Sequence, residues 1–176
     1  MKIDIICSGF GGQGVLTVGK FLASAAMTEG KHVSWLPSYG PEMRGGTANV
    51  SVIISSSFIA SPMVTKPDIL IALNQPSIDK FAENVKSGGT IIFNSDLCPN
   101  PSQRRDIDSV SLSMSKIAME LGDERSLNMV SIGAVIKHKN LVKYETVKKD
   151  LIKFLSKKNP ELLKLNLKAI KLGMGS

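Results

Sequence analysis

The chain has 176 residues, of which 43% are hydrophobic and 21% are charged, a balance typical of one globular domain with a single core. We therefore treat residues 1–176 as one domain. The two cysteines are too few for an iron–sulfur cluster with four thiolate ligands, and the two histidines lie in no zinc-ligand spacing, so we expect no metal site in this chain.

The net charge of +7 is concentrated towards the C-terminus. From residue 137 onward there are eleven lysines and three acidic residues, whereas residues 1–136 carry eleven basic and twelve acidic ones. A solvated lysine-rich face explains this pattern, and so does a docking face for an acidic partner or a phosphorylated ligand. The tail has few aromatic residues and no nucleic-acid-binding motif, so we expect no nucleic-acid partner.

Membrane and secretion signals are not evident in the sequence. The longest apolar runs are too short to span a bilayer, and the first residues lack the basic, apolar and small-residue pattern of a signal peptide. Together with the low cysteine content, this leads us to expect a cytoplasmic protein that does not bind membranes.

In chain order, β-rich runs alternate with helical periodicity. We expect strands at 2–8, 31–36, 47–55, 67–74, 89–95 and 109–113. We expect helices at 15–30, 115–121, 127–138, 144–156 and 160–172. The first helix should bury the apolar face formed by Val15, Val18, Leu22, Ala25 and Ala26. The alternation predicts a doubly wound α/β fold of three layers, with a largely parallel sheet and helices on both faces.

The sequence GFGGQG, residues 9–14, follows the first strand and opens the first helix. Gly9, Gly11 and Gly14 fit the spacing G-x-G-x-x-G, which is typical of dinucleotide binding. Backbone N–H groups and a helix N-terminus meet at such a turn, so it suits an anion. NAD or FAD binding also requires an acidic residue at the end of the second strand, and WLPSYG has none there. A phosphate site of another kind and a purely structural turn both remain open.

The connection after the second strand, LPSYGPEMRGGTANVSV at 36–52, is the second candidate. Its prolines and glycines make it irregular but locally stiff. Loops that follow the strands of an open α/β sheet form the ligand crevice, so we expect it beside the glycine turn. Arg44 suits a clamp on a carboxylate or phosphate, or else it pairs with Glu42 and holds the shape of the loop.

A third segment, LNQPS, places Asn74 and Gln75 after the fourth strand, where they either reach the same sheet edge or cap the next helix. No catalytic residue is evident. Neither histidine stands near a serine or cysteine in these motifs, and Cys7 lies inside a strand, where it should be buried. The thiamine diphosphate motif, GDG followed by a distant asparagine, is absent.

Four motifs in order, GFGGQGV, LPSYGPEMRGGTANVSVIIS, SPMVTKPDILIALNQPSIDKF and GGTIIFNS, resemble the gamma subunit of the 2-oxoacid:ferredoxin oxidoreductases. The 2-oxoglutarate enzyme is the most similar form, with pyruvate and 2-oxoisovalerate enzymes as alternatives. The resemblance implies a subunit, inactive alone, of a complex that converts a 2-oxoacid and coenzyme A to acyl-CoA and CO₂ while reducing ferredoxin. A different class, the free-standing nucleotide-binding redox module, is the other hypothesis.

The resemblance also implies partners, cofactors and site residues. Alpha, beta and delta subunits are the expected partners, with thiamine diphosphate between alpha and beta and [4Fe–4S] clusters in beta or delta. No cofactor is expected on this chain alone, which is a candidate contributor to a shared coenzyme A site or to a subunit interface. The residues that match the family motifs are Gly11, Gly12, Gln13, Gly14, Ser38, Tyr39, Gly40, Arg44, Gly45, Gly46 and Asn49.

Overall fold

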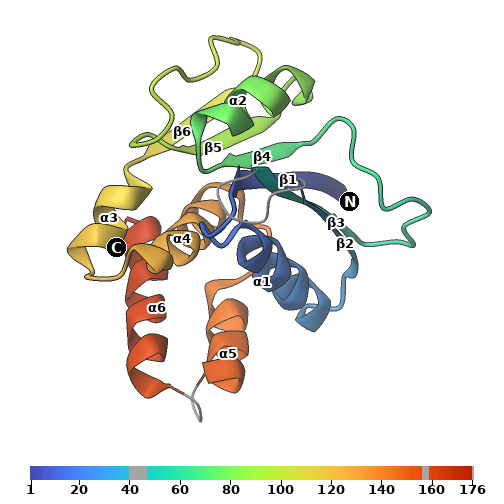
Figure 1. Ribbon diagram of the computed structural model, residues 1–176. Helices are drawn as coiled ribbons and strands as arrows, with labels where there is room; N and C mark the ends of the chain where they lie inside the picture. The colour runs from blue at the N-terminus through green and yellow to red at the C-terminus, as the bar shows by residue number, and fades with distance from the viewer. Residues whose placement is uncertain (40–46, 156–158, 176) are drawn as a thin grey trace.

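Six strands form one mixed sheet in the computed structural model, which describes residues 1–39, 47–155 and 159–175 (Figure 1). They are β1 (Lys2–Phe10), β2 (His32–Tyr39), β3 (Thr47–Ser55), β4 (Ile69–Ala72), β5 (Thr90–Asn94) and β6 (Asp108–Leu112). Their order across the sheet is β2-β3-β1-β4-β5-β6. β3 is antiparallel to both of its neighbours, whereas the β1–β4, β4–β5 and β5–β6 pairs are parallel. The largely parallel sheet predicted from the sequence is confirmed.

Helices cover both faces of the sheet, as the sequence predicted, but unequally (Figure 1). The more heavily covered face carries α1 (Val15–Thr28), α3 (Met114–Glu120), α4 (Leu127–Lys139), α5 (Tyr144–Leu155) and α6 (Pro160–Gly173), with the short 3₁₀ turn η2 (Glu124–Ser126) between α3 and α4. The other face carries α2 (Gln75–Phe81) and the 3₁₀ turn η1 (Ala82–Asn84). The five helices whose ranges the sequence predicted are therefore present, and α2 follows Asn74, where the capping interpretation of LNQPS expects a helix.

Side-chain alternation along the strands divides the core between these two layers. Ile5 and Cys7 of β1 face the larger cluster under α1 and α4, and Ile6 between them faces the smaller cluster under α2. β4 and β5 are buried at every position, as expected for parallel strands covered on both faces. The five residues predicted for the buried face of α1 are all buried, and Gly19 and Ala23 join them.

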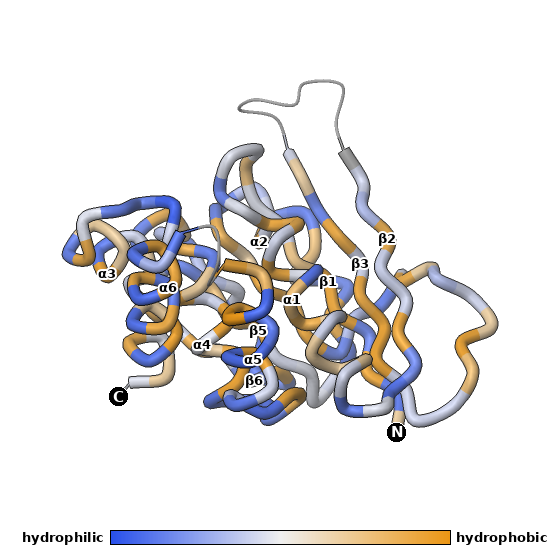
Figure 2. Tube along the Cα trace, turned by 90° about the horizontal axis from the view of Figure 1, so that it is seen from below, coloured by the Kyte–Doolittle hydropathy of each residue, from blue (hydrophilic) through white to orange (hydrophobic). Residues whose placement is uncertain are grey.

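Two strands at the border of the candidate site are longer than the sequence predicts. β1 continues to Phe10 rather than ending at residue 8, because Gly9 and Phe10 still pair with β3. β2 continues to Tyr39 rather than ending at residue 36, so the first residues of the predicted loop belong to this strand, whereas β3 begins at Thr47 and ends at Ser55 as the sequence predicted. The two strands pair as an antiparallel hairpin at the border of the sheet (Figure 2).

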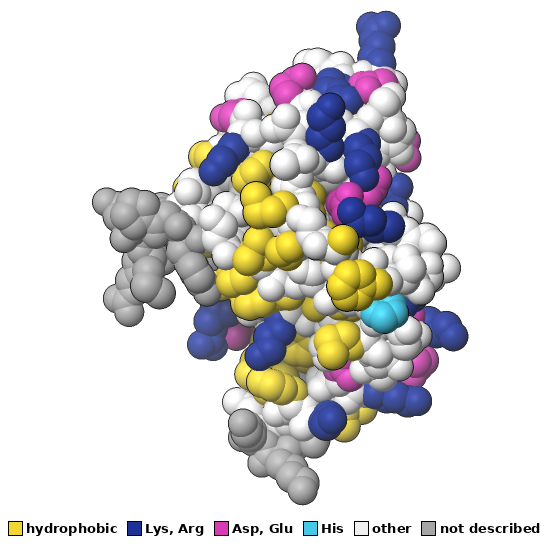
Figure 3. Space-filling model, turned by 90° about the vertical axis from the view of Figure 1, so that its right-hand side faces the viewer, with side chains coloured by type: hydrophobic (Ala, Val, Ile, Leu, Met, Phe, Trp, Pro, Cys, Tyr) yellow, Lys and Arg dark blue, Asp and Glu magenta, His cyan; other side chains and the backbone are white. Residues whose placement is uncertain are grey.

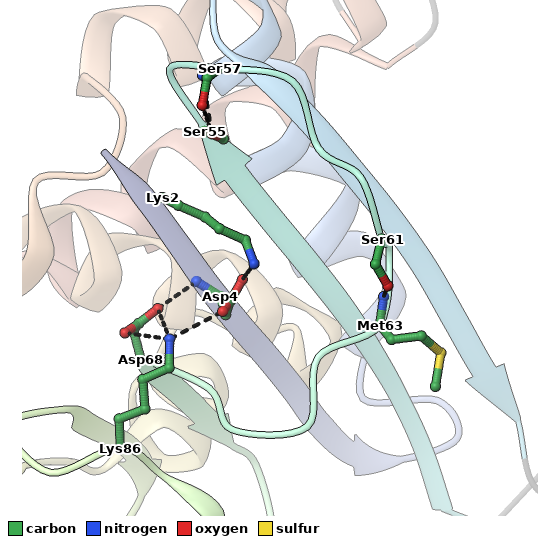
Figure 4. A network of polar contacts seen from close by, with 8 residues as sticks. All are labelled: Lys2, Asp4, Ser55, Ser57, Ser61, Met63, Asp68 and Lys86. Atoms are coloured by element: carbon green, nitrogen blue, oxygen red, sulfur yellow. Dashed lines mark hydrogen bonds and ion pairs between the residues drawn. The ribbon is translucent and has the colours of Figure 1, made fainter.

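A charged cluster holds the amino ends of β1 and β4 together (Figure 4). Lys86 Nζ lies 3.1 Å from Asp4 Oδ2 and 2.9 Å from Asp68 Oδ1, and the Asp4 backbone N–H donates to Asp68 Oδ2 at 2.7 Å. Partial burial alone would lower the pKa of Lys86, but the hydrogen bonds to Asp68 and Asp4 outweigh it and raise the pKa. The cluster lies at the sheet edge opposite the glycine turn, so we assign it a structural role.

The backbones of α4 and α6 approach closely where two glycines face each other. A Cβ on Gly133 would collide with the Ile170 carbonyl oxygen, and one on Gly173 would collide with the Val130 carbonyl oxygen. Neither glycine has a positive φ, so close packing rather than backbone conformation requires them. This contact fixes α6 against α4 and, through α4, against the sheet.

We therefore expect Gly133→Ala to lower the free energy of unfolding by about 1–3 kcal/mol, because the added methyl group overpacks a backbone contact that cannot move aside. Urea unfolding followed by circular dichroism measures the change. Lys168→Ala, at an exposed position on α6, is the control and should leave the transition midpoint unchanged. A Gly133→Ala protein as stable as the native chain would show that the two helices are free to separate.

Candidate functional site

The glycine turn, residues 11–14, joins the carboxyl end of β1 to the N-terminus of α1. Gly12 and Gly14 have φ values of 103° and 74°, which glycine adopts without the strain that a side chain would bring. A Cβ on Gly14 would lie 2.5 Å from Nδ2 of Asn128 on α4, so this glycine also makes room for a neighbouring helix. Around Gly12, in contrast, no atom lies within 4 Å of the Cβ position.

Gln13 fixes the turn to two strands at once. Its Oε1 accepts a hydrogen bond from the Phe10 backbone N–H at 2.7 Å, and its Nε2 donates to the Leu73 carbonyl oxygen at 3.2 Å. Gly9 makes this contact feasible, because a Cβ there would lie 2.6 Å from Gln13 Oε1. Packing within the protein thus accounts for Gly9 and Gly14 of the motif. Gly12, in contrast, has open space around its Cβ position and is not explained by packing.

The N-terminus of α1 opens on two cavities that share Gly12. No side chain caps this N-terminus, and no acidic residue lies in its first turn. One cavity, of about 320 Å³, extends towards α3 and is lined by Gly12, Gln13, Leu97, Ser115, Met119, Glu124 and Leu127. The other, of about 310 Å³, extends towards β3 and is lined by Phe10, Gly11, Gly12, Gly14, Val15, Leu16, Thr17 and Ala48. The exposed N–H groups of a helix end suit an anion in this position.

The hairpin brings two more of the predicted residues to the same edge of the sheet. Asn49 of β3 pairs in register with Ser8 of β1 on one side and with Ser38 of β2 on the other. Thr47, the first residue of β3, pairs with Phe10 at the start of the turn. The expectation that the hairpin lies beside the glycine turn therefore agrees with the register of these strands.

The remaining predicted residues of the hairpin are not described by the structure. Gly40, Arg44, Gly45 and Gly46 lie outside the described residues, and so does the alternative ion pair of Arg44 with Glu42. The backbone of Tyr39 ends β2. Their proposed contacts with a ligand or a partner stay predictions.

The LNQPS segment has a structural role of its own. Asn74, which is 1% exposed, caps α2: its Oδ1 accepts from the Ser77 backbone N–H at 3.0 Å. The Ser77 hydroxyl lies 2.9 Å from Ser8 Oγ on β1. Gln75 contacts the backbone of Asn100 through both its oxygen and its nitrogen. The helix-capping interpretation is therefore confirmed for Asn74, whereas Gln75 is the first residue of α2 and holds the backbone of Asn100.

The strand order adds a geometric argument against NAD or FAD. In a dinucleotide-binding fold the strand with the ribose-binding carboxylate lies next to the first strand. Here β3 lies between β1 and β2, so the end of β2 is two strand spacings, about 9–10 Å, from the turn. An acidic residue at the end of β2 would thus lie far from a ribose whose phosphates occupy the turn.

Both cysteines lie in the described part of the chain and are buried. Burial raises the pKa of the Cys7 thiol to about 12 and that of Cys98 to about 11, so both are protonated at neutral pH. Within residues 1–39, 47–155 and 159–175, no three or more His, Cys, Asp or Glu side chains are grouped so as to hold a metal ion. No helix in that part is long and apolar enough to cross a membrane.

Residues 4–176 match the family model described as pyruvate ferredoxin/flavodoxin oxidoreductase. The chain belongs to this family. Ketoisovalerate oxidoreductase subunit VorA of Methanothermobacter marburgensis is 37% identical over 98% of this chain, and the chain spans 36% of the length of that relative. 2-Oxoglutarate synthase subunit KorC of Methanocaldococcus jannaschii is 35% identical, and the match covers 92% of this chain and 88% of KorC.

Two solved structures of the same family share the fold. The gamma subunit of keto/oxoacid ferredoxin oxidoreductase from Geobacter sulfurreducens has a TM-score of 0.82 at 30% identity, covering 98% of this chain and 96% of that one. A 2-oxoglutarate:ferredoxin oxidoreductase from Magnetococcus marinus, with 2-oxoglutarate, coenzyme A and succinyl-CoA bound, has a TM-score of 0.91 at 27% identity, covering 99% of this chain and 30% of that one. The family resemblance seen in the sequence motifs is confirmed.

The Gln13 contact with both strands gives a direct test of the turn. In Gln13→Ala, the Phe10 N–H loses its acceptor, so its amide hydrogen should exchange faster, and the free energy of unfolding should fall by about 1 kcal/mol. Hydrogen exchange followed by NMR measures the first effect. Gln75→Ala removes a similar side-chain contact with the backbone elsewhere and should leave the Phe10 amide unchanged. Unchanged exchange in Gln13→Ala would mean that the turn holds its shape without this side chain.

Proposed function

We propose that this chain is the gamma subunit of a multi-subunit 2-oxoacid:ferredoxin oxidoreductase and that its glycine turn contributes to the binding of coenzyme A. The complex would convert a 2-oxoacid and coenzyme A to acyl-CoA and CO₂ and pass the electrons to ferredoxin. The observation that carries the proposal is Gly12, which stands in open space between two cavities at an uncapped helix N-terminus. The Magnetococcus relative with coenzyme A bound supports it.

Coenzyme A fits the chemistry of the turn in part. Its diphosphate is an extended anion that needs several N–H donors, and the first turn of α1 offers them without a competing carboxylate in that turn. The described residues that line the two cavities include Glu124 but no lysine or arginine. The turn therefore suits the diphosphate, while the 3′-phosphate of coenzyme A needs positive charge from elsewhere.

We propose 2-oxoglutarate as the 2-oxoacid, because the match to the 2-oxoglutarate synthase subunit KorC covers 88% of that relative. Pyruvate and 2-oxoisovalerate are the alternatives, because other relatives are subunits of ketoisovalerate and pyruvate/ketoisovalerate oxidoreductases. We also propose that alpha, beta and delta subunits carry the thiamine diphosphate and the [4Fe–4S] clusters and that the complex is cytoplasmic. The described residues of this chain show no set of side chains that would hold a cluster. The chain alone would then be inactive.

An exposed apolar patch supports assembly with other subunits. It lies along the edge strand β2, where the consecutive residues Trp35 and Leu36 face opposite sides of the sheet, and in the segment that follows β3, which holds Phe58 and Met63. These four side chains are 39%, 38%, 83% and 65% exposed. Figure 3 shows hydrophobic side chains gathered on this side of the molecule, with charged residues around them. Large apolar side chains that are exposed together on one side of a protein mark interaction sites. We propose that another subunit covers the patch, which a free-standing redox module would not require.

The test of coenzyme A binding uses the complex assembled with its partner subunits. Gly12→Ala adds a methyl group where a phosphate would approach, and it should raise the KM for coenzyme A about tenfold, equivalent to 1.4 kcal/mol, with the KM for the 2-oxoacid unchanged. Gly88→Ala is the matched control. Gly88 also has a positive φ and open space around it, so the backbone strain is similar, but it lies at the opposite edge of the sheet. An equal rise in both KM values in Gly12→Ala would contradict a coenzyme A site at the turn.

If the exposed apolar patch is a subunit interface, a substitution in it should weaken assembly. Phe58→Ser should leave the melting temperature of the lone chain nearly unchanged, because this side chain is mostly exposed, and it should weaken assembly with the partner subunits about tenfold or more. Native mass spectrometry of the mixed subunits measures the assembly. Ile152→Ser changes an exposed apolar residue on α5 and should assemble normally. Normal assembly of the Phe58→Ser chain would exclude the patch as an interface.

A further inference from the structure

One face of the β2–β3 hairpin lacks a covering helix among the described residues. α1 packs against β2 and β3 on one side of the sheet, whereas α2, on the other side, packs against β1 and β4 (Figure 1). The core cluster under α2 contains residues of β1, β4 and β5 but none of the described residues of β2 and β3. Ser51 pairs in register with Ile6, a member of that cluster, and with Leu36, so these side chains lie on the side of α2. We call this side of the hairpin, with Ser34, Leu36 and Ser51, the open face.

The open face and the segment beside it carry no charge. Residues 32–39 and 47–65 contain no lysine, arginine, aspartate or glutamate, although 21% of the whole chain is charged. A sheet face that stays in water normally carries polar and charged side chains. Here Ser51 is half-buried and Leu36 is 38% exposed. Depletion of charge is characteristic of the centre of a protein interface, so the composition indicates that another protein covers this face.

The segment between β3 and β4 borders the hairpin and is held at both ends. At one end, the Met1 amino group donates to Ser56 Oγ at 2.8 Å, and the Ser56 N–H donates to the Met1 carbonyl oxygen at 2.9 Å. At the other end, the Asp68 N–H donates to the Asp4 carbonyl oxygen at 2.7 Å. Figure 4 shows the segment running beside β3 between these ends. Its exposed apolar side chains are therefore held beside the hairpin, where they continue the uncharged surface.

The backbone decides which kind of element fits the open face. Strand addition at the outer edge of β2 is disfavoured by Pro37, which has no N–H. A proline is tolerated within a strand where its nitrogen points away from the neighbouring strand, so Pro37 interrupts hydrogen bonding along the outer edge. An extended segment laid over the face would bury its own backbone N–H and C=O groups without partners. A helix satisfies these groups internally, so a helix is the element that fits.

We propose that a helix of a partner subunit packs across the open face of β2 and β3 and continues the layer that α2 begins. This inference rests on the proposed function, because the complex supplies the partner. The contacting stripe of the helix is uncharged and largely apolar, since a charged side chain would be buried against a surface that offers it no opposite charge. Residues 34–38 of β2 extend about 13–16 Å, so about ten helical residues span the face.

The first experiment places a charge on the open face. Ser51→Lys should weaken assembly with the partner subunits about tenfold or more by native mass spectrometry. The melting temperature of the lone chain should stay nearly unchanged, because the lysine reaches water from an uncovered face. Ser51→Thr, which adds no charge, should assemble normally. So should Ser109→Lys, which changes an exposed serine on the same side of the sheet at the opposite edge.

A second variant keeps this test decisive if Ser51→Lys destabilises the lone chain. Ser34→Lys places the charge on the edge strand β2, and edge strands commonly carry lysine. A lysine at either position that leaves both the lone chain and the assembly unchanged would show that the open face stays in water, and the inference would be wrong.

The second experiment identifies what covers the face in the assembled complex. Ser34→Cys is labelled with a benzophenone maleimide, because the two native cysteines are buried, and the cross-linked peptides are identified by mass spectrometry. The expected product joins position 34 to one helical segment of a partner subunit. Cross-links to a second copy of this chain, or to an extended segment of a partner, would overturn the inference.

The inference and the proposed function fail in different ways. If Phe58→Ser weakens assembly and Ser51→Lys does not, the exposed apolar patch is an interface, the open face is not covered, and the role as a subunit stands. If the native chain does not assemble with the other subunits at all, the proposed function fails, and the inference fails with it.

Discussion

The side chain of Gln13 ties the turn after β1 to the end of β4, and the position of the candidate site depends on this contact. A glutamine can do this because its amide group presents an acceptor and a donor to two backbone groups at once. The contact requires glycine at position 9, where a Cβ would collide with it. Gly12 is then held in open space at the start of α1, which is the feature that a ligand can use.

The insertion of β3 between β1 and β2 determines what kind of ligand fits. It removes the adjacent strand end that holds a ribose in a dinucleotide fold, and it places a hairpin beside the turn instead. Ser38 and Asn49 lie on that hairpin, in register with β1 through Asn49 and Ser8. The same topology leaves β2 as an edge strand with exposed Trp35 and Leu36, so one arrangement of strands shapes both the candidate site and the proposed interface.

Local patterns in the sequence predicted the helices and strands well, because periodicity reports which side of each element is buried. The apolar face of α1 and the continuous burial of β4 are examples. The strand order was not predictable, since the pairing of β3 with β1 depends on residues about forty positions apart. Asn128 was missed for the same reason: nothing in the sequence of α4 indicates that this residue packs against Gly14. The two cavities at the turn also arise only from the packing of distant elements, so no local pattern predicted them.

The candidate site therefore divides into a part fixed by this chain and a part that its partners would complete. The turn and its cavities are formed by packing within the chain, whereas the exposed patch on β2 is the surface that we propose another subunit covers. The most direct test is a structure of the reconstituted complex with coenzyme A bound. Our account predicts diphosphate density within hydrogen-bonding distance of the backbone N–H groups at residues 12–15. Coenzyme A bound elsewhere, with a partner subunit packed into the space beside Gly12, would contradict it.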